Sequence, residues 1–415
     1  MCSTLLAGCG GGGSSGDGAG NTADSCTLAA QQTWLRNDML DRYLFNTQMP
    51  SPDPAAFSHI EDYFYALLVR TDSLGQPLDR WSYVENTASY NQFFGEGLDL
   101  GYGLAVAGRT TDPLPLRVRD IAPGSPAAAA GLVRGMVIET LNGQSAAALK
   151  AADDFSLLSP QASGTTLRLE VRDSPTGPLR QVSLTATVYG VSPVGNHLVM
   201  TSLAGRKVGY LFYRSFINAG TPALQATLAD FASQGVQDLV LDLRYNGGGL
   251  VSLARDLASA IVRAPSPTQP PIFVTLRFNA RHQADNFAFR YAAQPAHLGL
   301  PRVYVLSGVR TCSASELVVN GLKPFVEVVQ IGATTCGKPF GFMPVAHCGN
   351  TYSAINFESV NANGVGGYTS GISPTCAVAD DFDHALGDPA EALSAAALQH
   401  IDTGRCPPVS AAGVD

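Results

Sequence analysis

The chain has 415 residues, of which 45% are hydrophobic and 14% are charged, and its formal net charge is −8. This length predicts two or three domains, and the composition excludes an intrinsically disordered chain. The acidic balance, without clusters of Lys and Arg, argues against a nucleic acid or an anionic membrane surface as a partner.

The first residues resemble the cleavage site of a bacterial lipoprotein. A short run from Leu5 to Gly8 ends at Cys9, and a Gly- and Ser-rich stretch follows. The resemblance implies a lipid on Cys9, a signal remnant and tether over residues 1–24, and a periplasmic or outer-membrane location in the bacterial cell envelope. Only eight residues precede Cys9, which indicates a truncated start; the alternative is a Gly-rich leader. No later segment has the roughly 18 uninterrupted apolar residues of a membrane helix, so the only membrane contact we expect is through Cys9.

Residues 25–96 predict a small helical N-terminal region. Apolar side chains recur at helical spacing over residues 27–46 and again over 55–69, with a Pro-rich break between them. This region contains no motif typical of a catalytic or binding site, so we expect its role to be packing against the rest of the protein.

Residues 97–190 change to short alternating strands, for example at 116–120 and 167–171. The segment 122–143 between them resembles the core of a PDZ domain. The resemblance implies that the loop before it captures a terminal carboxylate with backbone N–H groups, while the peptide adds as a strand to the sheet edge. The alternative is that Gly103 only makes a turn. The predicted substrate-binding residues are Gly101, Tyr102, Gly103, Leu104 and Ala105.

Residues 191–415 alternate strands with helices. Residues 208–213, 238–243 and 303–306 read as strands, and 221–234 as an amphipathic helix between the first two. This alternation predicts an α/β architecture with βαβ crossovers.

The strand at 238–243 runs into a polar turn that contains Asn246, Gly247, Gly248 and Gly249. Glycines leave backbone N–H groups accessible to an incoming oxygen, as an oxyanion hole requires. A phosphate cradle or a plain loop would have a similar sequence, but no Gly-Lys-Ser/Thr follows the turn, which disfavours a P-loop.

Ser313 and Lys338 lie 25 residues apart, each within a motif of small residues. A serine hydroxyl becomes a good nucleophile when a neighbouring group takes its proton, and a desolvated lysine can do so. The chain has four lysines and 22 arginines, and arginine stays protonated. The alternative for Ser313 is helix capping, because Glu316 stands three positions on, as in a capping box.

Together these motifs resemble the C-terminal processing (tail-specific) serine peptidases. The resemblance covers about residues 97–400 and rests on five ordered features. These are the PDZ-like segment, Gly209 to Leu211 followed by Ser215 and Phe216, the glycine turn, the Ser313 and Lys338 motifs, and Gly371 to Pro374 with Leu386 to Asp388. It implies an α/β fold with a ClpP/crotonase-like serine protease core over residues 191–415, a β-rich PDZ domain inserted upstream at 97–190, and the small helical N-terminal region.

The resemblance also implies roles for single residues. Ser313 is the nucleophile and Lys338 the general base, and the backbone N–H groups of Ala314 and Gly248 form the oxyanion hole. A base near neutral pH needs the pKa of Lys338 lowered by several units, which burial beside the nearby phenylalanines would achieve.

Two further residues near Lys338 bear on its predicted role as the base. Many members of the family carry a glutamine four residues after the lysine to orient it, but Phe342 stands there in this chain. His347 is an alternative base, although a histidine near a loop is more often structural.

Six cysteines remain if Cys9 is lipidated and Cys2 is removed with the signal, and an even count in an exported chain indicates disulfides. An assembled Ser-Lys dyad would bring Cys312 and Cys336 together, so we expect a disulfide that clamps the two catalytic segments, or else two small buried cysteines. Cys348 with Cys376 is a second predicted pair. No cysteine or histidine has metal-site spacing, so we expect no metal and no cofactor.

The sequence thus predicts an exported serine endopeptidase that acts on protein or peptide substrates with free C-termini. Two alternatives stay open. One is a non-catalytic PDZ-bearing peptide-binding scaffold, which the missing glutamine suggests. The other, a Ser-Lys esterase or amidase for small molecules, leaves the PDZ-like segment without a purpose.

Overall fold

The computed structural model describes residues 26–108, 115–264, 266 and 268–408. Cys9 and the tether predicted over residues 1–24 lie outside the described residues. Within the described part of the chain, none of the helices has the length and apolar character needed to span a bilayer.

The core is a six-stranded sheet in which β10 runs antiparallel to β11 and all other neighbours are parallel. In spatial order its strands are β10 (Val194–Thr201), β11 (Lys207–Tyr213), β12 (Asp238–Asp242), β15 (Arg302–Ser307), β16 (Glu327–Gly332) and β21 (Cys376–Ala377). The strands predicted at 208–213, 238–243 and 303–306 are therefore confirmed.

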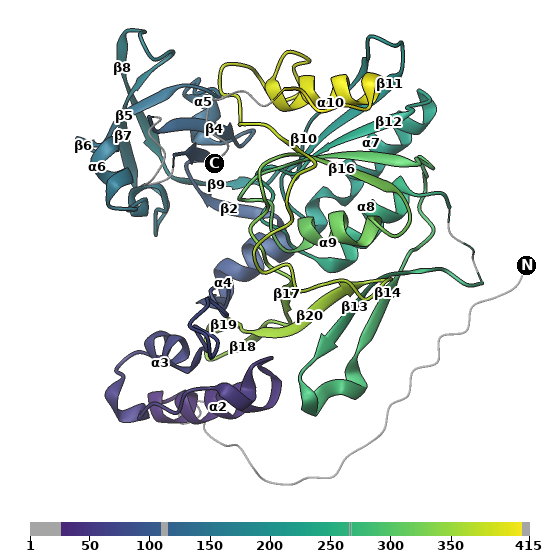
Figure 1. The fold of residues 1–415 in the computed structure, drawn as a ribbon. Coiled ribbons are helices and arrows are strands. Elements are labelled where there is room, and N and C mark those ends of the chain that lie inside the picture. The colour runs from purple at the N-terminus through teal and green to yellow at the C-terminus, as the bar shows by residue number, and fades with distance from the viewer. Residues whose placement is uncertain (1–25, 109–114, 265, 267, 409–415) are drawn as a thin grey trace, which may run out of the picture.

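Helices cover both faces of this sheet. Tyr210 and Phe212 of β11 pack on the side of α10 (Ala392–Thr403), and the alternate residue Leu211 packs on the opposite side. The helices on that opposite side are α7 (Thr221–Ser233), α8 (Val251–Ile261) and α9 (Ala314–Leu322). Figure 1 shows α10 on one side of the sheet and α8 and α9 on the other. Because both faces of the sheet are covered, its strands have continuous apolar sequences. The predicted α/β architecture with βαβ crossovers is confirmed.

A second, antiparallel sheet lies beside α9 and extends away from the core (Figure 1). In order it contains β14 (Phe287–Arg290), β13 (Ile272–Phe278), β20 (Ile355–Asn361) and β17 (Phe340–Phe342). The edge strand β17 begins two residues after Lys338, so this sheet determines where the lysine segment runs.

The N-terminal region is only partly helical. Thr27 caps α2 (Leu28–Arg42), and α3 (Ile60–Leu67) follows a 3₁₀ turn at Pro54–Ala56 that delays the helix predicted from residue 55. The chain then forms β1 (Tyr83–Asn86) and the short α4 (Thr87–Tyr90). β1 pairs with β19 (Asn350–Ser353), which pairs in turn with β18 (Val345–His347), so the region shares a sheet with the distant C-terminal half of the chain.

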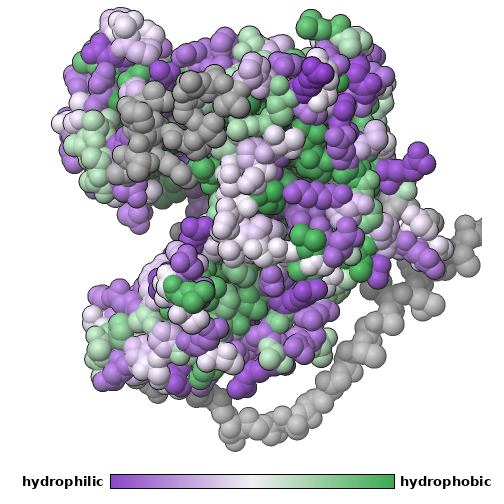
Figure 2. Space-filling model, viewed as in Figure 1, coloured by the Kyte–Doolittle hydropathy of each residue, from purple (hydrophilic) through white to green (hydrophobic). Residues whose placement is uncertain are grey.

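Residues 98–108 and 115–190 form a separate β-rich unit with its own apolar core. Its main sheet has the order β3 (Leu104–Ala107), β4 (Arg117–Ile121), β5 (Val137–Leu141), β7 (Thr166–Arg172) and β8 (Leu179–Thr185), with β6 (Gln144–Ser145) against β5. The short helices α5 (Pro126–Ala129) and α6 (Ala146–Ala151) belong to it, and β2 (Leu98–Gly101) pairs with β9 (Thr187–Gly190) where the chain enters and leaves. Figure 2 shows a hollow between this lobe and the lobe that contains α2 and α3.

Ion pairs and hydrogen bonds hold the β-rich unit against the core. Arg134 donates from Nη1 to the Tyr245 hydroxyl at 2.6 Å and from Nη2 to Asp380 at 2.7 Å. Arg214 of the core pairs with Asp120 at 2.6 Å. Because Tyr245 directly precedes the glycine turn, the β-rich unit contacts the segment that leads to it.

A buried ion network anchors the same segment from inside the core. The Arg244 side chain is 2% exposed and donates to three carboxylates: Asp242 at the end of β12, Asp380 after β21, and Glu391 at the start of α10. Burial is tolerable for this guanidinium because each of its nitrogens has an acidic partner.

Replacing Arg244 by methionine should strongly destabilise the fold, because Asp242 and Glu391 would stay buried without their cation. We expect a loss of about 3–5 kcal/mol in the free energy of unfolding, measured by urea-induced unfolding. Arg255→Met is the matched control, since Arg255 pairs with Asp256 where both side chains are more than one-quarter exposed; it should cost at most about 1 kcal/mol. Equal losses in the two variants would contradict this account.

Candidate active site

Ser313 lies where the loop after β15 enters α9, in a conformation that serine rarely adopts. Its φ is +55° and its ψ is −117°. A non-glycine residue held at positive φ costs on the order of 1–3 kcal/mol, so neighbouring contacts must hold it. A sharp turn between a strand and a helix exposes the side chain of its central residue, as in the nucleophile turns of hydrolases.

Contacts with the glycine turn hold the Ser313 segment. The Cys312 N–H donates to the Asn246 carbonyl at 3.1 Å, and the Ser315 hydroxyl donates to the same carbonyl at 2.9 Å. Gly248 packs directly behind the serine, since a Cβ placed on it would lie 2.8 Å from the Ser313 Cβ. The two segments therefore meet at a position that only glycine can occupy.

The fully buried carboxylate of Glu316 joins the serine segment to the lysine segment. It accepts the Ser313 N–H at 3.0 Å, and it also accepts the N–H groups of Gly337 at 2.9 Å and Lys338 at 2.8 Å. Burial raises the pKa of Glu316, while these bonds and one from the Thr335 hydroxyl act in the opposite direction. Glu316 therefore caps α9, as the capping-box alternative predicted, and it also binds the backbone of the loop that carries Lys338.

Lys338 and Ser313 line one cavity of about 270 Å³. No hydrogen bond joins the Ser313 hydroxyl to the Lys338 ammonium in the described structure. The Lys338 Nζ instead lies 3.7 Å from the centre of the Phe342 ring and 5.9 Å from the centre of the Trp81 ring. The phenylalanine that replaces the expected glutamine is therefore in direct contact with the lysine.

Burial lowers the pKa of Lys338 to about 7, and the nearby carboxylates of Asp79 and Glu316 oppose that shift. At neutral pH a substantial fraction of this amine is then unprotonated, as a general base requires.

The glycine turn presents a different set of donors than expected. The Gly248 N–H donates to the Asn246 side-chain oxygen at 2.8 Å and is therefore occupied. Among the described residues, the N–H groups of Gly249 and Ala314 have no acceptor, and Gly249 lines the cavity. Gly249 was not among the predicted site residues, because three consecutive glycines do not show which of their N–H groups faces the cavity.

The N-terminal region contributes to the site, which contradicts the expectation that it only packs. Tyr83 lines the cavity with Ser313, while Arg80 donates to the Cys336 carbonyl at 2.9 Å. Trp81 and Arg80 also line a neighbouring polar cavity of about 1220 Å³ that reaches Lys338. No local pattern in residues 77–84 signalled this, because their partners lie more than 250 positions away.

The predicted carboxylate-binding loop lies apart from this cavity, in the β-rich unit. It follows β2, and it leads into β3, an edge strand of its sheet. Gly103 has a φ of +67°, and a side chain there would overlap Ser125. The sequence from Gly101 to Ala105 thus forms a tight turn and the start of a strand whose outer edge has no partner strand among the described residues.

His347 is not placed to serve as the base. It stacks on Trp34 with the ring centres 3.9 Å apart, at the junction with the N-terminal helices. It is not among the residues that line the Ser313 cavity.

Three disulfides join the described cysteines. Cys312 is bonded to Cys336, with their Cα atoms 5.2 Å apart, as expected. The predicted pair of Cys348 with Cys376 is wrong, because Cys348 is bonded to Cys26, and Cys376 to Cys406. Both Cys26 and Cys348 lie at the junction between the N-terminal region and the β18–β19 hairpin, a proximity that the sequence did not indicate.

Two described clusters bring metal-ligating residue types together: Cys312, Glu316 and Cys336, and Cys376, His400 and Cys406. All four cysteines are disulfide-bonded and offer no thiolate, so neither cluster has the donors of a structural zinc site.

The chain is similar to proteins of one peptidase family. Two protein-family models match it: "Peptidase family S41" over residues 207–364 and "Peptidase S41 N-terminal domain" over residues 30–83. Carboxyl-terminal-processing peptidase 2, chloroplastic, of Arabidopsis thaliana is 28% identical over 254 residues, which are 59% of this chain and 45% of that protein. The carboxyl-terminal-processing protease of Picosynechococcus sp. is 28% identical over 217 residues, which are 52% of this chain and 49% of that protein.

The chain therefore spans about half the length of these relatives. The crystal structure of a putative S41 protease from Bacteroides fragilis NCTC 9343 is similar with a TM-score of 0.67 and 26% identity, over 89% of this chain and 97% of that one.

Peptide mapping under non-reducing conditions should recover Cys312 linked to Cys336 when the protein is produced in an oxidising compartment. The expectation rests on the proximity of the two segments, which Glu316 holds together independently of the sulfurs. Mass spectrometry before and after reduction provides the measurement. Free thiols at both positions would contradict the structure, whereas the Cys376–Cys406 link in the same sample serves as the internal control.

The amine of Lys338 should titrate with a midpoint near pH 7, because burial disfavours its charged form. The chain has only four lysines, so NMR of ¹³C-labelled lysine across pH 5.5–10 can resolve each one. Lys338→Met identifies the signal by its loss. A midpoint near the ordinary lysine value of about 10.4 would show that the site is far better solvated than the structure indicates.

Proposed function

Because the chain belongs to peptidase family S41, we propose that it is a serine endopeptidase in which Ser313 and Lys338 form the catalytic dyad. The observation that carries the proposal is that two segments 25 residues apart place a strained serine and a buried, low-pKa lysine in one cavity.

The proposed reaction begins with proton transfer from the Ser313 hydroxyl to the neutral Lys338 amine. The serine oxygen then attacks the peptide carbonyl, and the lysine returns the proton to the departing amine as the C–N bond breaks. Water, deprotonated by the same lysine, hydrolyses the acyl-enzyme. The hydroxyl and the amine must come within hydrogen-bond distance before the first step.

The negative charge that develops on the carbonyl oxygen needs N–H donors. We assign the Ala314 N–H, at the start of α9, as one donor. Gly248 is the second donor if Asn246 releases its N–H; the free Gly249 N–H, one residue further on, supplies the same charge stabilisation without that rearrangement.

We propose that the β-rich unit is a PDZ domain that binds the C-terminal ends of substrates at β3. The edge position of β3 and the tight turn at Gly103 support this assignment. A peptide would add to the free edge of β3 and direct its carboxylate at the backbone N–H groups of the preceding turn.

We also propose an exported, periplasmic or outer-membrane location with a lipid on Cys9. Three disulfides among the described cysteines support an oxidising compartment.

Two observations favour a second candidate, a non-catalytic scaffold of the same family that only binds peptides. The predicted oxyanion donor of Gly248 is occupied by Asn246, and no hydrogen bond joins Ser313 to Lys338. Labelling by a fluorophosphonate that is lost in Ser313→Ala would favour the enzyme.

Ser313→Ala and Lys338→Ala should each reduce cleavage of casein by at least about 10³-fold, because each removes one half of the dyad. Wild-type activity should rise with pH through about 7, since protonated Lys338 below that value cannot accept the serine proton. Fluorescent casein assays from pH 5 to 9 provide the measurement, and circular dichroism confirms that the variants fold. Lys207→Ala, a change of an exposed lysine in β11, is the matched control. Full activity in Lys338→Ala would disprove the dyad.

A further inference from the structure

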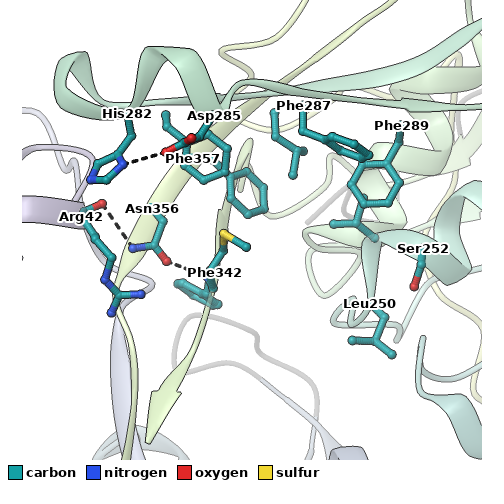
Figure 3. Close-up of a pocket in the computed structure, with 14 residues that line it drawn as sticks. Arg42, Leu250, Ser252, His282, Asp285, Phe287, Phe289, Phe342, Asn356 and Phe357 are labelled. Carbon is teal, nitrogen blue, oxygen red and sulfur yellow. Dashed lines mark hydrogen bonds and ion pairs between the residues drawn. The ribbon is translucent and has the colours of Figure 1, made fainter. Parts of the chain in front are cut away.

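A second cavity lies on the other side of Phe342 from the proposed dyad. Its volume is about 570 Å³, within the range of small-ligand sites, and its walls are mainly apolar. Figure 3 shows Phe342 and Phe357 between a polar end, at His282 and Arg42, and an apolar end at Phe287 and Phe289.

This cavity adjoins the cavity that contains Ser313 and Lys338. Four residues line both of them: Leu250, Val251, Phe342 and Phe357. Leu250 and Val251 directly follow the glycine turn. A polypeptide whose scissile bond lies at Ser313 therefore has a neighbouring residue within reach of the second cavity.

The charged groups at the polar end already have partners. Arg42 pairs with Asp38 at 2.5 Å, and His282 pairs with Asp285 at 2.8 Å and Asp41 at 3.2 Å. Paired charges offer little to a charged substrate residue, so the apolar walls determine which side chain the cavity favours.

The apolar walls are partly exposed to water. Phe287 is 55% exposed and Met343 is 54% exposed, although both are large apolar residues. A substrate side chain that covered them would remove apolar surface from water on both partners, which favours binding.

We propose that this cavity binds a bulky apolar side chain of the polypeptide substrate beside the scissile bond, and that Phe342 couples its occupancy to the position of Lys338. The inference rests on the proposed peptidase function and specifies its substrate class. The occupant is an unfolded segment that carries a large apolar residue, preferably aromatic, next to the bond that is cut.

Phe342 is suited to this coupling because it contacts both sites. The centre of its ring lies 3.7 Å from the Lys338 Nζ and 5.6 Å from the centre of the Tyr83 ring, which it meets edge-on. The same ring forms part of the wall of the second cavity. A ring face attracts an ammonium group, so the ring stabilises Lys338 after it has accepted the serine proton. A substrate side chain packed against Phe342 would restrict the ring's motion, so it should raise kcat as well as lower KM.

The first test compares two fluorogenic peptides that differ only in one residue beside the scissile bond, Phe or Ser. We expect wild type to cleave the Phe peptide with at least a tenfold higher kcat/KM. Phe287→Ser and Met343→Ser should reduce that ratio at least fivefold, and both sites are exposed enough to tolerate serine. Leu203→Ser is the matched control, since Leu203 is fully exposed in the β10–β11 turn; its ratio should equal that of wild type. Ratios near one in wild type, or unchanged in both cavity variants, would overturn the proposal.

The second test separates coupling from binding. Phe342→Leu keeps an apolar wall but removes the ring, so kcat for the Phe peptide should fall about tenfold or more. The midpoint of its pH profile should move down, since Asp79 and Glu316 would be the charged groups left to favour the lysine ammonium. Phe342→Tyr should restore most of the kcat. A Phe342→Leu variant with wild-type kcat and midpoint would disprove the coupling.

A third measurement distinguishes failure of this proposal from failure of the proposed function. If no variant cleaves any peptide, the peptidase assignment fails, and binding of the fluorescein-labelled Phe peptide to Ser313→Ala decides the cavity's role. Fluorescence anisotropy should then show at least fivefold weaker binding when Phe287→Ser is added to Ser313→Ala. Equal affinities would overturn the cavity proposal as well.

Discussion

The buried carboxylate of Glu316 is the interaction on which the proposed catalytic arrangement depends. It accepts N–H groups from both the serine turn, which lies between β15 and β16, and the lysine loop, which follows β16. A carboxylate without such donors would be costly to bury, so the two loops and the charge stabilise one another. The Cys312–Cys336 disulfide joins the same two loops covalently, beside the carboxylate.

The environment of Lys338 balances two opposing effects. Burial favours the neutral amine that the proposed base needs, whereas Asp79, Glu316 and the Phe342 ring favour the ammonium form. A pKa near 7 is the outcome of this balance. An aromatic ring therefore stands where the resemblance predicted a glutamine, and it brings the wall of a neighbouring apolar cavity into contact with the proposed base.

Three regions of the chain meet around the glycine turn that packs against Ser313 and the neighbouring loop that carries Lys338. Arg244 anchors this turn from the core through three carboxylates, and Arg134 of the β-rich unit contacts the adjacent Tyr245. From the N-terminal region, Arg80 contacts the loop that carries Lys338. The site is thus assembled from three regions, and its geometry depends on how they pack.

The sequence by itself determined the α/β core and singled out Ser313 and Lys338, which the structure places in one cavity, because apolar periodicity, glycine turns and short motifs act over a few residues. It also indicated that Phe342 was unusual, without showing what it contacts. Only the tertiary structure decided the Cys26–Cys348 pairing, the aromatic contacts of Lys338 and the occupied Gly248 N–H. The Cys26–Cys348 bond and the Trp81 contact join residues more than 250 positions apart, and the Gly248 bond depends on a side-chain orientation. Such contacts follow from how whole elements pack, and no local pattern encodes them.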